Sequence, residues 1–106
     1  MDKVDKLLLK VGVPPHLSGY RYIKAALEEK DTQRMMTLYQ RVADRYGSKA
    51  ILVERCMRHA VEAAFDRMEP AVQEEIFGST VSGWKGKATN SAFLMTLRLY
   101  LEGEAE

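Results

Sequence analysis

The sequence predicts an all-α fold of about six helices. Apolar residues recur at intervals of three and four along most of the chain, which places them on one side of a helix. No segment alternates apolar and polar residues for long enough to predict a strand, and no internal repeat is visible. A length of 106 residues is typical of one domain, so residues 1–106 are predicted to form a single helical domain with one modest core.

The first two predicted helices are separated by residues that break helices. The first spans residues 1–11, and Gly12 with Pro14 and Pro15 ends it. Its apolar stripe consists of Val4, Leu7, Leu8 and Val11. The second helix runs for about three turns with Ser18 as its predicted cap. Gly19 near its start predicts either close packing or a helix that begins late. Its apolar side consists of Leu17, Tyr20, Ile23, Ala26 and Leu27.

Two helices joined by a short polar turn occupy the middle of the chain. The shorter helix spans residues 37–46, and its apolar stripe consists of Leu38, Tyr39, Val42, Ala43 and Tyr46. Gly47 ends it, and Ser48 is predicted to cap a longer helix over about 49–67. The apolar side of that helix consists of Val53, Cys56, Met57, Ala60, Val61 and Ala64. This side is expected to face the core.

The other side of the helix over 49–67 is polar. It carries Glu54, Arg55, Arg58, His59 and Glu62. A short helix, a turn with glycine and a longer helix with outward Arg and His are typical of a helix-turn-helix over about 37–67, whose second helix enters the DNA major groove. Residues 34–67 carry seven basic and four acidic side chains, although the whole chain has a net charge of only +1. The same helix pair also occurs in proteins where such arginines are merely solvated, so both interpretations stay open at this point.

Two more helices are predicted after residue 67. A short one covers residues 69–78, with Pro70 at a first-turn position and Gly78 as the terminating residue. Its apolar residues are Val72, Ile76 and Phe77. A loop over 79–89 leads to the last helix, which Asn90 is predicted to cap. The residues predicted to face inward are Phe93, Leu94, Leu97 and Tyr100.

The composition gives no sign of an enzyme, a cofactor or a metal site. His16 and His59 have no cysteine or histidine at metal-ligand spacing, and Cys56, the single cysteine, is predicted to be a small buried hydrophobe. The 46% hydrophobic and 29% charged fractions are those of an ordinary soluble globular protein. The longest aliphatic run near the N-terminus, residues 7–9, is too short for a signal peptide or a membrane span. We therefore expect a cytoplasmic protein without catalytic residues.

Four segments carry a more specific pattern. They are residues 12–20, 53–62, 77–82 and 85–93, and they include Val-Glu-Arg at 53–55, Arg-His-Ala at 58–60 and Thr-Asn-Ser-x-Phe at 89–93. Together they resemble the C-terminal effector domain of the sporulation response regulator of endospore-forming bacteria. The resemblance spans nearly the whole chain and implies a compact bundle of six helices containing the helix-turn-helix. It also implies double-stranded promoter DNA with short direct repeats as the partner, on which two copies would occupy tandem sites.

The resemblance also implies which residues bind DNA. The base- and phosphate-contacting residues of the recognition helix match Glu54, Arg55, Arg58 and His59, and lysines near the DNA backbone match Lys85 and Lys87. Glu54 could accept a hydrogen bond from a cytosine amino group or pair with Arg58 four residues on. Ile51 and Leu52 depart from the family pattern, which usually has a small polar residue and an arginine there.

Two alternatives concern the role of the domain and what precedes it. A helical module of the same fold could contact a protein, such as a polymerase sigma subunit, without reading DNA itself. Regulators of this family also carry an N-terminal phosphoacceptor receiver domain, which these 106 residues do not include. The chain is therefore either an excised effector domain or a stand-alone relative under other control.

Overall fold

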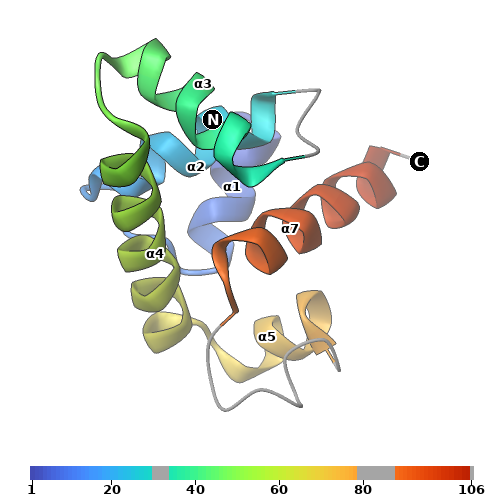
Figure 1. Cartoon of the computed structure of the whole chain (residues 1–106). Helices are drawn as coiled ribbons and strands as arrows, with labels where there is room; N and C mark the ends of the chain where they lie inside the picture. Colours follow the sequence, from blue (N-terminus) through green and yellow to red (C-terminus); the bar gives the residue numbers. More distant parts are fainter. Residues whose placement is uncertain (30–33, 79–87, 106) are drawn as a thin grey trace.

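A computed structural model describes residues 1–29, 34–78 and 88–105, and these residues form six helices and no strand (Figure 1). The helices are α1 (Lys3–Lys10), α2 (Ser18–Glu28), α3 (Met35–Tyr46), α4 (Ala50–Arg67), α5 (Pro70–Ile76) and α7 (Asn90–Ala105). The predicted all-α fold is confirmed. The two helices predicted over 37–46 and 49–67 are also confirmed, with ends that differ by one or two residues.

The helices surround one hydrophobic core. In Figure 1, α4 lies along one edge of the molecule, where it packs against α2 and α3 and also touches α7. Each described helix except α5 contributes fully buried side chains, and Phe77, directly after α5, is also fully buried. The largest of these side chains are Leu8, Ile23, Leu38, Met57, Phe77, Phe93 and Leu97. The radius of gyration is 13.0 Å, which matches the value of about 13 Å expected for a compact chain of this length.

The closest approach between two helices lies where α2 crosses α4. Gly19 of α2 is buried, and a Cβ atom built on it would lie 2.6 Å from the Cβ of Ala60 and closer still to the carbonyl oxygen of Cys56. Only a residue without a side chain fits against the α4 backbone at this point. The predicted close packing at Gly19 is thereby confirmed.

The turn between α3 and α4 closes the first helix but does not cap the second. Gly47 has a left-handed backbone with φ of +63°, and the N–H of Ser48 donates to the carbonyl of Ala43 at 2.8 Å. This pattern is a Schellman motif, in which glycine avoids the strain of the left-handed conformation. The predicted role of Ser48 as a cap was wrong. Lys49 occupies the cap position of α4 and its side chain makes no capping hydrogen bond, because Ser48 lies one residue too early.

Two other predicted caps are also one residue out of register. Ser18 is the first residue of α2, and the preceding Leu17 takes the cap position without a side-chain hydrogen bond. At the start of α7 the hydroxyl of Thr89 accepts from the N–H of Ala92 at 3.2 Å, so Thr89 caps this helix and Asn90 does not. Both corrections have one cause, since a cap must stand at a single position and neighbouring polar residues look alike in sequence.

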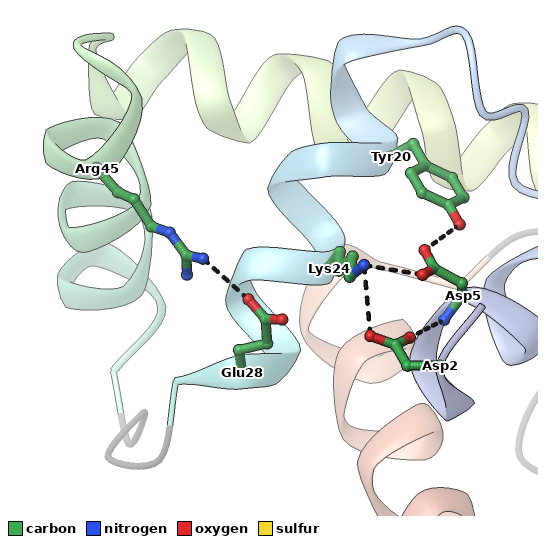
Figure 2. Close-up of polar contacts among 6 residues, drawn as sticks. All are labelled: Asp2, Asp5, Tyr20, Lys24, Glu28 and Arg45. Atoms are coloured by element: carbon green, nitrogen blue, oxygen red, sulfur yellow. Dashed lines mark hydrogen bonds and ion pairs between the residues drawn. The ribbon is translucent and has the colours of Figure 1, made fainter.

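A polar network joins α1 to α2 (Figure 2). The carboxylate of Asp5 accepts from the hydroxyl of Tyr20 at 2.7 Å and from the ammonium of Lys24 at 2.8 Å, and Lys24 also lies 3.5 Å from Asp2. The Lys24 hydrogen bond, followed by the Tyr20 hydrogen bond, lowers the pKa of Asp5 to about 2. Burial, followed by the hydrogen bond to Asp5, raises the pKa of Tyr20 to about 12. The network fixes α1 against the helix that supports α4.

Candidate nucleic-acid interface

One side of α4 points away from the core and forms an exposed ridge. Ile51, Arg55, Arg58 and Glu62 stand on it at positions i, i+4, i+7 and i+11, and all four are exposed. The opposite side is buried and consists of Val53, Met57, Ala60, Val61 and Ala64. The predicted division of this helix into a core face and a polar face is therefore confirmed, and we call the exposed side the α4 ridge.

Glu54 and Arg58 form an ion pair along one flank of the α4 ridge. A guanidinium nitrogen of Arg58 lies 3.1 Å from a carboxylate oxygen of Glu54, one helical turn away. An exposed pair of this kind contributes little to stability, typically about 0.3–0.5 kcal/mol. Its main consequence is geometric, because the pair holds the Arg58 side chain along the helix. The predicted pairing of Glu54 with Arg58 is confirmed as a contact.

Arg55 lies on the α4 ridge and His59 lies on its other flank. Both side chains are exposed. Within the described ranges, no hydrogen bond or ion pair involves either side chain. The Arg55 guanidinium therefore keeps all its donors available for an external acceptor, such as the O6 and N7 atoms of guanine. Arg58 differs because it is already engaged with a carboxylate.

A shallow groove of about 420 Å³ runs between α4 and the start of α2. Its walls are Leu17, Ser18, Gly19, Leu52, Arg55, Cys56 and His59. Cys56 is half-buried and lines this groove, so the prediction of a small buried hydrophobe was only partly correct. The reason is the edge position of Cys56 on the apolar stripe, where the neighbouring Gly19 of α2 has no side chain that could cover it.

The other flank of α4 is tied to α3 and α7 through Asn90. The side-chain amide of Asn90 donates to the hydroxyl of Tyr39 at 3.1 Å and to the backbone carbonyl of Glu54 at 3.2 Å. Asn90 is buried, and burial raises the pKa of Tyr39. A buried amide that bonds two neighbouring helices fixes their relative position, because separating them leaves polar groups without partners. We call this arrangement the Asn90 junction.

A basic surface adjoins the start of α4. The guanidinium of Arg21 lies 5.5 Å from the centre of the Tyr46 ring, and that of Arg45 lies 5.9 Å from it. Arg45 also pairs with Glu28 at 3.1 Å, which joins α3 to α2 (Figure 2). Arg21 itself is exposed. Lys85 and Lys87, the two other predicted DNA contacts, lie outside the described residues.

The sequence matches the family described as "Sporulation initiation factor Spo0A C terminal" over residues 4–101. The chain belongs to this family. The match covers α2 to α5 completely and α1 and α7 in large part, and it includes all six residues that the sequence analysis assigned to DNA contact. The resemblance noted from the motifs in residues 12–20, 53–62, 77–82 and 85–93 is thereby confirmed.

Metal-binding clusters and membrane-spanning helices would point to functions outside the role that the family name describes. Among residues 1–29, 34–78 and 88–105, no three His, Cys, Asp or Glu side chains lie close enough together to hold a metal ion. None of the helices described there combines the length and the apolar character that crossing a bilayer requires.

The contribution of three residues to this surface was not recognised from the sequence. Asn90 was taken for a helix cap, and its two tertiary hydrogen bonds reach residues 51 and 36 positions away, which no local pattern reveals. Arg21 is recognisable only once α2 and α3 are seen side by side. Ile51 was noted only as a departure from the family. A helical wheel would have placed it on the same line as Arg55 and Arg58.

Proposed function

We propose that this domain binds double-stranded promoter DNA in a sequence-specific manner as a transcription regulator of sporulation, with α4 as the recognition helix in the major groove. The observation that carries the proposal is the α4 ridge, where Arg55 and Arg58 are exposed on a helix whose other face is buried. His59 is exposed on the flank of the ridge. A rigidly held helix with outward basic side chains is what major-groove recognition requires. Membership of the sporulation initiation factor family supports the same role.

The two arginines have different predicted tasks. Arg55 has no partner among the described residues, so it can bond a guanine with two parallel hydrogen bonds. Arg58 is oriented by Glu54 and reads a base from a restricted position. His59 and Glu54 flank this pair as further contacts. Lys85 and Lys87 are proposed as phosphate contacts, which position the protein but carry no sequence information.

The test begins with selection of preferred duplexes from a random library, followed by fluorescence anisotropy on a selected and a scrambled duplex. Measurements at two salt concentrations separate phosphate contacts from base contacts, because each phosphate contact adds about 0.9 to the slope of log affinity against log salt. Sequence-specific binding predicts that the selected duplex binds at least about 10³-fold more tightly. Replacing Lys85 and Lys87 with alanine should lower the salt slope by about one to two units. Equal affinity for both duplexes would contradict the proposal.

A second candidate function has one supporting observation. Met95 and Leu99 on α7 are exposed apolar residues one turn apart, which suits contact with another protein, such as a polymerase sigma subunit. In that case the domain would bind the sigma subunit and would not distinguish the selected duplex from the scrambled one. Binding of two copies to tandem sites is a separate proposal, and duplexes with one and two selected boxes test it by their binding stoichiometry.

A further inference from the structure

Two large aliphatic side chains are exposed on the first turn of α4. Ile51 is 60% exposed and Leu52 is 44% exposed. They are the second and third residues of the helix, which begins at Ala50. A helix end that reads DNA is normally polar, so an isoleucine and a leucine facing solvent there call for a partner with an apolar group. Neither side chain contributes to the buried core.

Both residues lie within reach of whatever Arg55 contacts. Ile51 precedes Arg55 by one turn on the α4 ridge, a separation of about 6 Å along the helix axis. Leu52 lines the same groove as Arg55 and His59. A rise of about 6 Å corresponds to about two base-pair steps of 3.4 Å, so the three side chains address neighbouring bases if α4 enters the major groove.

We propose that Ile51 and Leu52 contact the C5-methyl groups of thymines, and that this domain therefore prefers thymine within about two base pairs of the guanine bound by Arg55. The proposal rests on the proposed function of α4 as the recognition helix. Thymine is the base whose major-groove edge carries an apolar group. Cytosine at the same position would place its amino donor against an aliphatic side chain with no acceptor, which disfavours it.

The charges around the two residues favour DNA over a protein as the occupant. Arg55 stands one turn after Ile51 and lines the same groove as Leu52, and no described residue pairs with its guanidinium. The positive charge of this exposed guanidinium complements a phosphate backbone. Between the exposed apolar residues Met95 and Leu99 of α7, Arg98 is half-buried and donates to the carbonyl of Ala26 at 2.6 Å.

The first experiment changes only the DNA. Each thymine of the selected duplex is replaced in turn by uracil, which removes the methyl group and keeps the hydrogen-bonding edge of the base. Loss of one buried methyl contact predicts binding weaker by about fourfold at one or two thymines next to the guanine, and no change elsewhere. The affinity should fall without a change in the salt slope, because no phosphate contact is lost.

The second experiment assigns the methyl groups to side chains. Ile51→Ala and Leu52→Ala should each weaken binding to the thymine duplex, and each should reduce the uracil effect at one position to less than about twofold. Met95→Ala and Leu99→Ala are the matched controls, because these side chains on α7 are similarly exposed at 62% and 61%. The controls should retain the full uracil effect.

The outcomes separate this inference from the proposed function. Clear preference for the selected duplex with no uracil effect at any thymine would overturn the inference alone. An uracil effect that persists undiminished in both Ile51→Ala and Leu52→Ala would overturn the assignment to these residues. Absence of any preference between selected and scrambled duplexes would overturn both the inference and the proposed function.

Discussion

The helices α4 and α7 are the two longest described, with 18 and 16 residues, and they differ in the charged side chains that they expose to solvent. Both bury an apolar stripe in the same core. On the outside, α4 carries the cationic ridge of Arg55 and Arg58, whereas α7 exposes Met95 and Leu99. The two helices are therefore similar in length, and the exposed arginines of α4 make it the better candidate for contact with DNA.

The start of α7 also supports α4. Asn90 at the start of α7 bonds the backbone of α4, and the ring of Phe93 lies 6.0 Å from that of Phe65 on α4. The start of α7 therefore holds α4 in position. The outer side of α7 takes no part in these contacts. Changes on the two helices should separate into effects on stability, on positioning and on DNA contact.

The largest expected effect is at the contact between α2 and α4. Gly19→Ala places a Cβ atom against the Cys56 carbonyl and the Ala60 side chain, so the two helices must move apart. Overpacking of this kind is expected to lower the free energy of unfolding by about 3 kcal/mol. Urea denaturation followed by circular dichroism measures the loss.

Gly103→Ala is the matched control for that change. Gly103 also lies in a helix, α7, but a Cβ atom there would meet no other atom within 4 Å. Alanine should be neutral or stabilise the protein by about 0.5–1 kcal/mol, because it favours the helix. If both variants were equally stable, α2 and α4 would not be packed as closely as the structure indicates.

A smaller effect is expected at the Asn90 junction. Asn90→Ala leaves the Tyr39 hydroxyl and the Glu54 carbonyl without their shared donor, at a cost of about 2 kcal/mol in unfolding free energy. Ser91→Ala, an exposed neighbour, should change stability by less than about 0.5 kcal/mol. If α7 positions α4, the Asn90 variant should also bind selected DNA more weakly at a temperature where it remains folded. Unchanged affinity would limit Asn90 to a role in stability.

The core was predictable from sequence because burial repeats with the helical period. Val53, Met57 and Ala60 were assigned to the core by spacing alone, and all three are buried. Leu94 and Leu97 on α7 were found in the same way. A stripe averages over several residues, so an error of one residue at the helix end does not change which side faces inward.

Helix caps and tertiary hydrogen bonds were not predictable in this way. Ser18, Ser48 and Asn90 were each assigned as caps, and each stands one position away from a cap. Only the geometry of a single residue separates these cases. The partners of Asn90 and Arg21 come from other helices. The part of the candidate site on α4 was therefore predictable from the sequence, whereas the contacts that depend on α2, α3 and α7 were not.

A further effect, which depends on pH, concerns α1, far from the α4 ridge in sequence. The pKa of Asp5 is lowered from 3.8 to about 2, so its interactions with Lys24 and Tyr20 stabilise the fold fully above about pH 4. This contribution is lost as the pH falls from about 4 through 2. Urea denaturation between pH 5 and 2 should show the stability of the wild type approaching that of Asp5→Asn. A difference that stays constant over this range would contradict the lowered pKa.

The α4 ridge is the proposed surface for reading DNA, and Arg55→Ala tests this proposal most directly. Arg34→Ala is the control, because Arg34 is exposed at the start of α3, at the opposite end of that helix from the turn to α4. Fluorescence anisotropy should show that Arg55→Ala costs about 1–3 kcal/mol on the selected duplex and far less on a scrambled one, while Arg34→Ala changes neither. Equal losses on both duplexes would reduce Arg55 to a phosphate contact, and no loss on either would contradict the central claim.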